Sequence, residues 1–126
     1  MENSTPKKIL IMEDEVDLVA SIKKLLEKCG YRVNAAYDTA SSIDMAGKER
    51  ADLIILDLAI PGGGGFTILK EIRKNGANAK TPVLIMTAST EKMVRDEAEA
   101  IGVEGFMCKP FEPSELMQKI KDLVGE

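Results

Sequence analysis

One aspartate and one cluster of three acidic residues each follow a short apolar run, at positions where carboxylates can form a reactive site. Asp57 follows the run Leu53–Leu56, and the acidic cluster Glu13–Glu15 follows the run Ile9–Met12. Each run is continuous rather than alternating, which is typical of a strand buried on both faces of a parallel sheet. Open α/β sheets bind ligands in the crevice outside the carboxyl ends of their strands. Two acidic strand ends there indicate a cation site, and Asp57 becomes a candidate reactive group.

Carboxylates that lie close together need positive charge beside them. Glu13, Asp14 and Asp57 can converge, because the loops after the first and third strands of a doubly wound sheet can be neighbours. Their mutual repulsion makes it costly to ionise all of them. Lys109 ends the last predicted strand at the same edge, and Mg²⁺ takes oxygen ligands in octahedral geometry while keeping several waters. Charges of about −3 from the carboxylates, +1 from the lysine and +2 from the metal sum to roughly zero, so the site can accept a dianionic phosphoryl group.

The chemistry that these groups favour is attack of a carboxylate on phosphorus. An aspartyl phosphate is an established covalent intermediate, and its formation depends mostly on positioning and charge neutralisation. Thr87 ends the fourth predicted strand, where its hydroxyl can donate to a phosphoryl oxygen. Taken alone, Asp57 reads equally well as a turn residue, Thr87 as a strand former and Lys109 as a surface charge. Their joint occurrence at strand ends favours the functional interpretation.

Strand-like and helix-like patterns alternate along the chain, which is the signature of βαβ units and a parallel sheet. The predicted strands are Lys8–Glu13, Tyr31–Ala36, Asp52–Asp57, Pro82–Thr87 and Glu104–Cys108. The helices are marked by apolar residues at helical spacing over 18–26, 39–48, 66–72, 94–101 and 116–123. Gly30 is expected to end the first helix, Asp38 or Thr39 to cap the second, and Pro113 to begin the fifth, which ends near Gly125. The fold class is therefore α/β, with a doubly wound five-stranded parallel sheet.

Length and charge limit the kinds of protein this can be. The 126 residues fit one domain. Residues 1–7 are expected to be a short flexible tail and residues 8–126 the domain, with no room for an output domain after it. The net charge of −4 argues against a nucleic-acid-binding surface. No run approaches the roughly 20 apolar residues of a membrane span, and the N-terminus has no apolar signal core, so we expect a cytoplasmic protein without membrane insertion.

Histidine and cysteine usage narrows the chemistry further. Histidine is absent, which excludes histidine-based triads, zinc sites of the H-E-x-x-H kind and a role as a phosphohistidine carrier. Phosphoryl chemistry would therefore use carboxylate, hydroxyl and amine groups. Cys29 and Cys108 have no metal or redox spacing, and we expect them to be reduced and largely buried small hydrophobes.

Several short segments together resemble one protein family. They are Ile-Leu-Ile-Met-Glu-Asp-Glu at 9–15, Leu-Asp-Leu-Ala-Ile-Pro-Gly at 56–62, Thr-Ala-Ser at 87–89 and Lys-Pro-Phe at 109–111. On these segments the chain resembles a two-component response-regulator receiver domain of the CheY type, from Lys8 to Val124. The resemblance implies a flavodoxin-like sheet with strand order 2-1-3-4-5.

The resemblance also implies a role for each matching residue in phosphoryl transfer. Asp57 would be the phosphoacceptor and take its phosphoryl group from a histidine kinase or phosphotransfer protein. Asp14 and Asp57 would ligate Mg²⁺ directly, with the Ala59 backbone carbonyl as a third protein ligand and Glu13 acting through water.

The remaining implied roles concern the output of the domain. Thr87 and Lys109 would hold phosphoryl oxygens, and Phe106 falls at the aromatic switch position, where the ring follows the Thr87 hydroxyl. The family also has a cis bond before the proline at the position of Pro110. We expect a stand-alone switch, monomeric or weakly dimeric, that acts through a separate protein target and catalyses only its own phosphorylation and dephosphorylation.

Two positions depart from the usual family pattern. Glu13 stands where the family most often has Asp. Gly63 and Gly64 replace bulkier residues, so we expect the glycine run 62–65 to be held loosely.

Other functions remain as alternatives. A phosphatase of the haloacid dehalogenase type needs a second aspartate two residues after the nucleophile, where Ala59 stands. A flavodoxin-like mononucleotide binder would place its phosphate against the acidic cluster Glu13–Glu15, which repels it. A receiver fold that works as an interaction module without phosphorylation stays open, and a phosphoacceptor assay separates it from the switch.

Overall fold

The apolar runs of the sequence form a central parallel sheet. The computed structural model describes residues 5–60, 62, 64–74, 76–89 and 91–125, and its five parallel strands pair in the order β2-β1-β3-β4-β5. The strands are β1 Lys8–Met12, β2 Arg32–Ala36, β3 Leu53–Asp57, β4 Val83–Thr87 and β5 Gly105–Cys108. Each is one residue shorter than predicted, a difference within the usual uncertainty of strand ends. The fold class and the strand order are confirmed.

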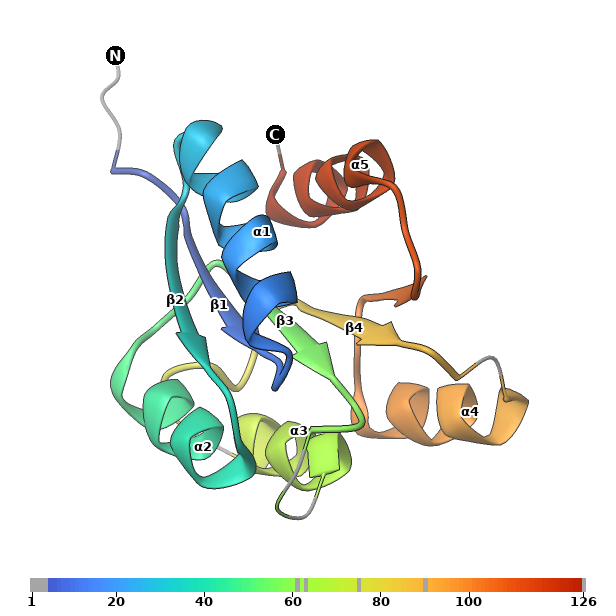
Figure 1. Ribbon diagram of the computed structural model, residues 1–126. Helices are drawn as coiled ribbons and strands as arrows, with labels where there is room; N and C mark the ends of the chain where they lie inside the picture. Colours follow the sequence, from blue (N-terminus) through green and yellow to red (C-terminus); the bar gives the residue numbers. More distant parts are fainter. Residues whose placement is uncertain (1–4, 61, 63, 75, 90, 126) are drawn as a thin grey trace.

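Helices cover both faces of the sheet (Figure 1). They are α1 Val16–Lys28, α2 Thr39–Lys48, α3 Gly64–Lys74, α4 Lys92–Ile101 and α5 Pro113–Val124. α1 and α5 lie on one face, and α2, α3 and α4 lie on the other. Every residue of β3 and β4 is buried, because helices cover these strands from both sides. This double burial explains why the central strands read as continuous apolar runs.

The predicted helix ends are present in the structure. Gly30 follows α1 with a φ of 94°, a left-handed conformation that favours glycine. Asp38 caps α2, since its side chain accepts a hydrogen bond from the Ser41 amide at 2.7 Å. Pro113 begins α5, and Gly125 ends it in the left-handed region. Local sequence signals therefore set where these helices begin and end.

The glycine run contains residues with specific backbone roles. Gly62 and Gly64 have φ values of 92° and 84°. Gly65 lies in the first turn of α3 and donates its amide to the Leu58 carbonyl at 2.9 Å. A Cβ atom on Gly65 would lie 2.5 Å from the Leu58 Cα atom, so the close approach of α3 to this loop requires glycine. The expectation of a loosely held run falls partly on residue 63, which lies outside the described residues.

The burial predicted for the cysteines is wrong. Cys29 and Cys108 are both free and exposed. Cys29 is the C-cap residue of α1, beyond the buried stripe of that helix. Cys108 ends β5, an edge strand of the sheet. Residues 1–4 of the predicted tail lie outside the described residues, and within the described ranges no helix has the length and apolar character to cross a bilayer.

Candidate functional site

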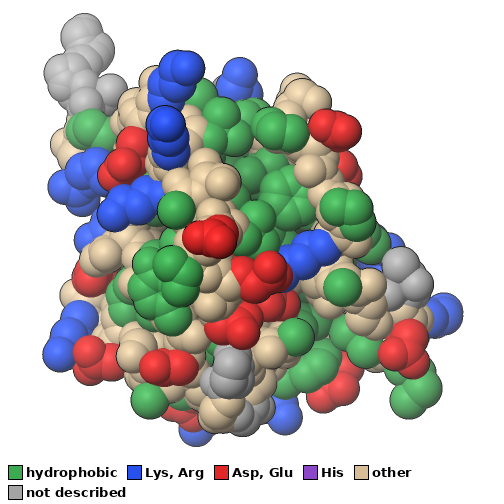
Figure 2. Space-filling view, in the orientation of Figure 1, with side chains coloured by type: hydrophobic (Ala, Val, Ile, Leu, Met, Phe, Trp, Pro, Cys, Tyr) green, Lys and Arg blue, Asp and Glu red, His purple; other side chains and the backbone are tan. Residues whose placement is uncertain are grey.

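The strand order brings the acidic groups of the sequence to one place. β1 and β3 are neighbours, with Met12 beside Leu56 in the register, so Glu13 and Asp57 follow at the same level. β1 continues to α1 on one face of the sheet and β3 to α3 on the other, which opens a crevice between them. Carboxylate oxygens of Glu13, Asp14 and Asp57 all lie within 4.8 Å of one another. Acidic side chains gather at the centre of the face shown in Figure 2.

Burial raises the free-energy cost of keeping these carboxylates charged. Glu13 is completely buried and Asp57 is 3% exposed, whereas Asp14 is open to solvent. Two of the three carboxylates are therefore removed from water, and solvent reaches the cluster from the side of Asp14. Burying a carboxylate is costly unless it is paired.

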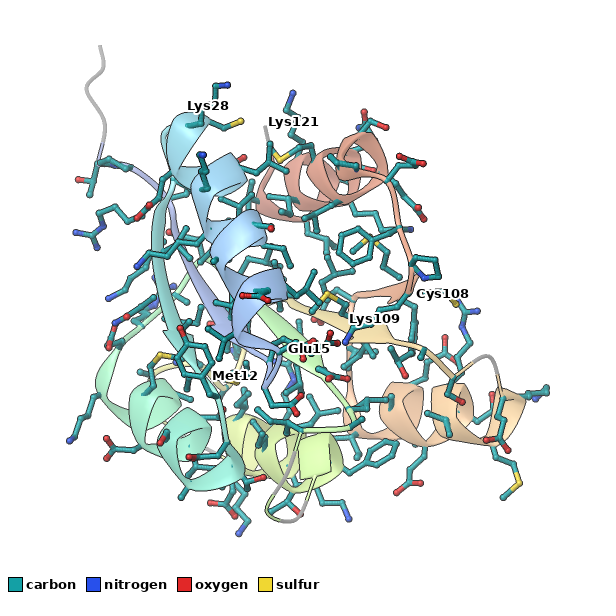
Figure 3. The ribbon with its side chains drawn as sticks, viewed as in Figure 1. Met12, Glu15, Lys28, Cys108, Lys109 and Lys121 are labelled. Atoms are coloured by element: carbon teal, nitrogen blue, oxygen red, sulfur yellow. The ribbon has the colours of Figure 1, made fainter. Side chains whose placement is uncertain are left out.

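Lys109 supplies the pairing charge. Its Nζ atom lies 2.7 Å from Glu13 Oε1, 3.2 Å from Glu15 Oε1 and 3.4 Å from Asp57 Oδ2. Figure 3 shows Lys109 reaching from the end of β5 toward Glu15. The Lys109 amide donates a hydrogen bond to the Thr87 carbonyl at 2.8 Å, which fixes the backbone of the lysine beside β4. The bond from Lys109 to Pro110 is cis, as the family resemblance implies.

The pKa values of Glu13 and Lys109 shift for related reasons. Burial raises the pKa of the Glu13 carboxyl, and the hydrogen bonds from Lys109 and from the Glu15 amide oppose the shift without cancelling it. Burial by itself would lower the pKa of the Lys109 ammonium. The hydrogen bond to Glu13 and the charge of Asp57 outweigh this and hold the Lys109 pKa above its ordinary value. Lys109 therefore keeps its positive charge at neutral pH.

The Asp57 carboxylate is held in a defined orientation. Its Oδ1 atom accepts a hydrogen bond from the Ala59 amide at 3.0 Å, and its Oδ2 atom faces Lys109. The Gly65 amide donates a hydrogen bond to the Leu58 carbonyl, which holds the loop that carries Ala59 against α3. The structure thus shows the Ala59 N–H engaged with Asp57, and metal ligation by its carbonyl stays a prediction.

Thr87 and Phe106 lie beside this cluster, Thr87 on the inner strand β4 and Phe106 on the edge strand β5. Thr87 is buried, and its hydroxyl oxygen accepts a hydrogen bond from the Ser89 amide at 3.1 Å. Phe106 is half-buried on β5 and pairs with Ile85 in the register, two residues before Thr87 on β4. The structure therefore gathers Glu13, Asp14, Asp57 and Lys109 into one cluster. Thr87 and Phe106 border one pocket.

Two contacts of the site were not predicted from the sequence. Glu15 pairs with Lys109, although the sequence shows Glu15 only as one more acidic residue of its cluster. The Ser89 amide engages the Thr87 hydroxyl, although a hydroxyl at a strand end gives no sign of its partner. Both depend on side-chain direction, which residue spacing does not encode.

The donor set fits a hard divalent cation. Every ligand atom in the cluster is a carboxylate oxygen, and Asp14 leaves one side open to solvent. Mg²⁺ prefers one or two carboxylates together with several waters, which this arrangement allows. The ion would also reduce the repulsion between buried carboxylates.

Mg²⁺ is therefore expected to stabilise the fold, because it binds the folded arrangement and not the unfolded chain. At ten times its dissociation constant the stabilisation is about 1.4 kcal/mol. Asp14→Ala should remove most of it, and Asp44→Ala, which deletes an exposed carboxylate on α2, should leave it intact. Thermal unfolding with and without Mg²⁺ measures this. An undiminished shift in Asp14→Ala would exclude Asp14 as a ligand.

Comparisons with known proteins agree with this geometry. A family model described as the response regulator receiver domain matches residues 9–121. The alkaline phosphatase synthesis transcriptional regulatory protein PhoP of Bacillus subtilis is 32% identical over 94% of this chain and 48% of PhoP. The chain spans about half the length of the curated relatives it matches.

Solved structures resemble the whole of the described fold. The chemotaxis response regulator CheY4 of Vibrio cholerae is 30% identical with a TM-score of 0.89, over 94% of this chain and 99% of CheY4. The receiver domain of the sensor histidine kinase PA1611 of Pseudomonas aeruginosa is 26% identical with a TM-score of 0.87, over 97% of this chain and 100% of that domain. That structure holds a magnesium ion coordinated in its active-site cleft.

Proposed function

The chain belongs to the response regulator receiver domain family of two-component systems, and on that premise we propose that it is a signalling switch activated by phosphorylation of Asp57. The observation that carries the proposal is the setting of this carboxylate. Asp57 is buried at a strand end, with one oxygen held by the Ala59 amide and the other facing Lys109. The phosphodonor would be a histidine kinase or a histidine phosphotransfer protein.

In the proposed transfer, a carboxylate oxygen of Asp57 attacks the phosphorus of a phosphohistidine. The new O–P bond forms as the P–N bond breaks, and the leaving imidazole takes up a proton. Lys109 holds one oxygen of the phosphoryl group, since its ammonium already faces Asp57. The protein acts by positioning and charge neutralisation, so it is a phosphoacceptor rather than an enzyme acting on other substrates. We propose that it also catalyses its own dephosphorylation.

The metal site belongs to the same proposal. When bound, Mg²⁺ would neutralise charge that develops on the phosphoryl oxygens. Asp14 and Asp57 would be direct ligands, with the Ala59 carbonyl as the third. Glu13 would act through water, and its 2.7 Å bond to Lys109 suits that indirect role because one of its oxygens is already engaged.

Incubation with Mg²⁺ and acetyl phosphate tests the proposed function without knowledge of the kinase. The intact mass should increase by one phosphoryl group, and the same incubation with a chelator in place of Mg²⁺ should give little product. Peptide mapping after borohydride reduction should locate the group on Asp57. A protein that gains no phosphoryl group under these conditions would instead be a receiver fold used as an interaction module.

Thr87→Ala is expected to separate phosphorylation from its structural effect. The hydroxyl oxygen accepts from the Ser89 amide, which leaves its O–H free to donate to a phosphoryl oxygen. A charge-assisted hydrogen bond of this kind is worth about 1.5 kcal/mol, or roughly tenfold in rate. The variant should accept phosphate about tenfold more slowly. Amide chemical shifts of α4 should respond to Mg²⁺ and beryllofluoride in the parent and in Thr87→Ser, but not in Thr87→Ala. A full response in Thr87→Ala would exclude the hydroxyl as the link.

The downstream partner is proposed to be a protein that reads the surface of α4, β5 and α5. Met93 on α4 is 81% exposed, a large apolar side chain of the kind that partner proteins cover. The net charge of −4 favours a protein over a nucleic acid as the partner of this domain.

A further inference from the structure

One charged side chain covers the ring at the proposed switch position. The guanidinium carbon of Arg95 on α4 lies 4.6 Å from the centroid of the Phe106 ring. This is the distance and arrangement of a cation–π contact. Arg95 is exposed and Phe106 is half-buried, so the guanidinium covers the solvent side of the ring. Among the described residues, the Arg95 side chain has no ion pair that would hold it elsewhere.

A pocket borders this contact. It has a volume of about 160 Å³, and its lining includes Thr87, Val94, Arg95, Phe106 and Cys108. The pocket is partly open to solvent and is also bordered by Ser89 and Glu91, and its volume is close to the ~150 Å³ that holds a benzene molecule in an enclosed apolar cavity. The Phe106 ring can therefore occupy two places: under the Arg95 guanidinium, as observed, or further toward Thr87.

The two places differ in what they offer the ring. In the observed one the ring keeps its contact with Arg95. A ring displaced toward Thr87 gains contact with that end of the pocket and no longer lies centred under the guanidinium, although Arg95 also borders the pocket. The Thr87 hydroxyl borders the same pocket and is held by Ser89 in this structure, so a shift of Thr87 toward Asp57 would enlarge the space available to the ring.

We propose that Arg95 is a positioning residue that holds the Phe106 ring outside this pocket in the unphosphorylated domain and so sets the resting balance of the switch. The inference rests on the proposed function, because the inward place matters only if phosphorylation draws Thr87 away. Loss of an exposed cation–π contact should shift a two-place equilibrium about two- to fivefold. Arg95 thus adjusts how readily the switch responds without touching the phosphoryl group.

Fluorine NMR can follow the ring directly. The chain has only three phenylalanines, Phe66, Phe106 and Phe111, so 4-fluorophenylalanine gives three signals, and Phe106→Leu identifies the one of interest. Mg²⁺ with beryllofluoride provides the reference position of the inward ring. The measured quantity is the inward fraction of the resting protein.

Three variants separate the ring contact from general charge effects. Arg95→Met keeps the apolar stem and should raise the resting inward fraction about two- to fivefold. Arg95→Lys keeps a cation and should stay closer to the parent. Lys92→Met removes the same charge from the same helix, where the lysine pairs with Asp96, and should match the parent.

Two results would overturn the inference alone: a parent-like inward fraction in Arg95→Met, or an equal rise in Lys92→Met. In both, beryllofluoride still moves the ring, so the proposed function stands. A parent protein whose ring does not respond to beryllofluoride and which gains no phosphoryl group from acetyl phosphate would overturn the proposed function and, with it, this role of Arg95.

Discussion

Asp57→Asn is expected to abolish phosphorylation and to stabilise the metal-free domain. An amide is not a nucleophile toward phosphorus under these conditions, so no phosphoryl group should be gained from acetyl phosphate. The stabilisation has a separate cause. Asp57 is nearly fully buried with Glu13 and Asp14 within 4.8 Å, and Lys109 is already shared with Glu13 and Glu15. Removing one negative charge from a net negative neighbourhood should raise the free energy of unfolding by about 1 kcal/mol.

Mg²⁺ should reduce or remove this difference in stability. The ion stabilises the parent by relieving the same repulsion, and Asp57→Asn loses a ligand, so the advantage of the variant should shrink or disappear in saturating Mg²⁺. Intact mass and chemical unfolding, each with and without Mg²⁺, measure the two effects.

Asp38→Asn is the matched control for this substitution. Asp38 lies at the same edge of the sheet, after β2, and caps α2. Asparagine is an equally good cap, so the variant removes a carboxylate without loss of structure. It should be phosphorylated like the parent. Labelling of Asp57→Asn at the rate of Asp38→Asn would show that Asp57 is not the phosphoacceptor.

The central strands could be predicted from the sequence because burial on both faces produces a simple pattern of residues. β3 and β4 are covered on both faces, and apolar residues therefore follow one another without interruption. The helix ends were equally readable at Gly30, Asp38 and Pro113, where a local backbone requirement selects the residue type. The exposure of Cys29 and Cys108 could not be read, because small apolar residues at helix and strand ends look the same whether or not a neighbour covers them.

The site was predictable up to the point where side-chain direction decides the contacts. Parallel strands end at one edge, so Glu13, Asp14 and Asp57 had to lie near each other. The partners of Lys109 could not be predicted in this way. Glu15 lies 94 residues away along the chain, and the sequence does not show whether its carboxylate contacts solvent or Lys109. The contact of Arg95 with Phe106 likewise depends on how α4 lies against β5, which no local pattern records.

The position of Gly65 shows how closely the site and the fold are connected. The glycine lies in the first turn of α3, where it packs against the loop that follows Asp57. A Cβ atom there would lie 2.5 Å from the Leu58 Cα atom and 2.8 Å from the Asp57 carbonyl oxygen. Both neighbours are backbone atoms, which cannot rotate away as a side chain can. Alanine at this position would therefore push α3 and the loop apart.

Gly65→Ala is expected to lower the free energy of unfolding by about 3 kcal/mol, the upper part of the range for overpacking. Gly47→Ala is the control, because an added Cβ on this α2 residue meets nothing within 4 Å and should stabilise the helix by about 0.5–1 kcal/mol. Urea unfolding measures both. Since Leu58 directly follows Asp57, the displaced loop should also slow phosphorylation of Gly65→Ala from acetyl phosphate. If Gly65→Ala is as stable as the parent, the loop gives way at little cost, and the glycine run serves mobility rather than the close packing of α3 beside the phosphoacceptor.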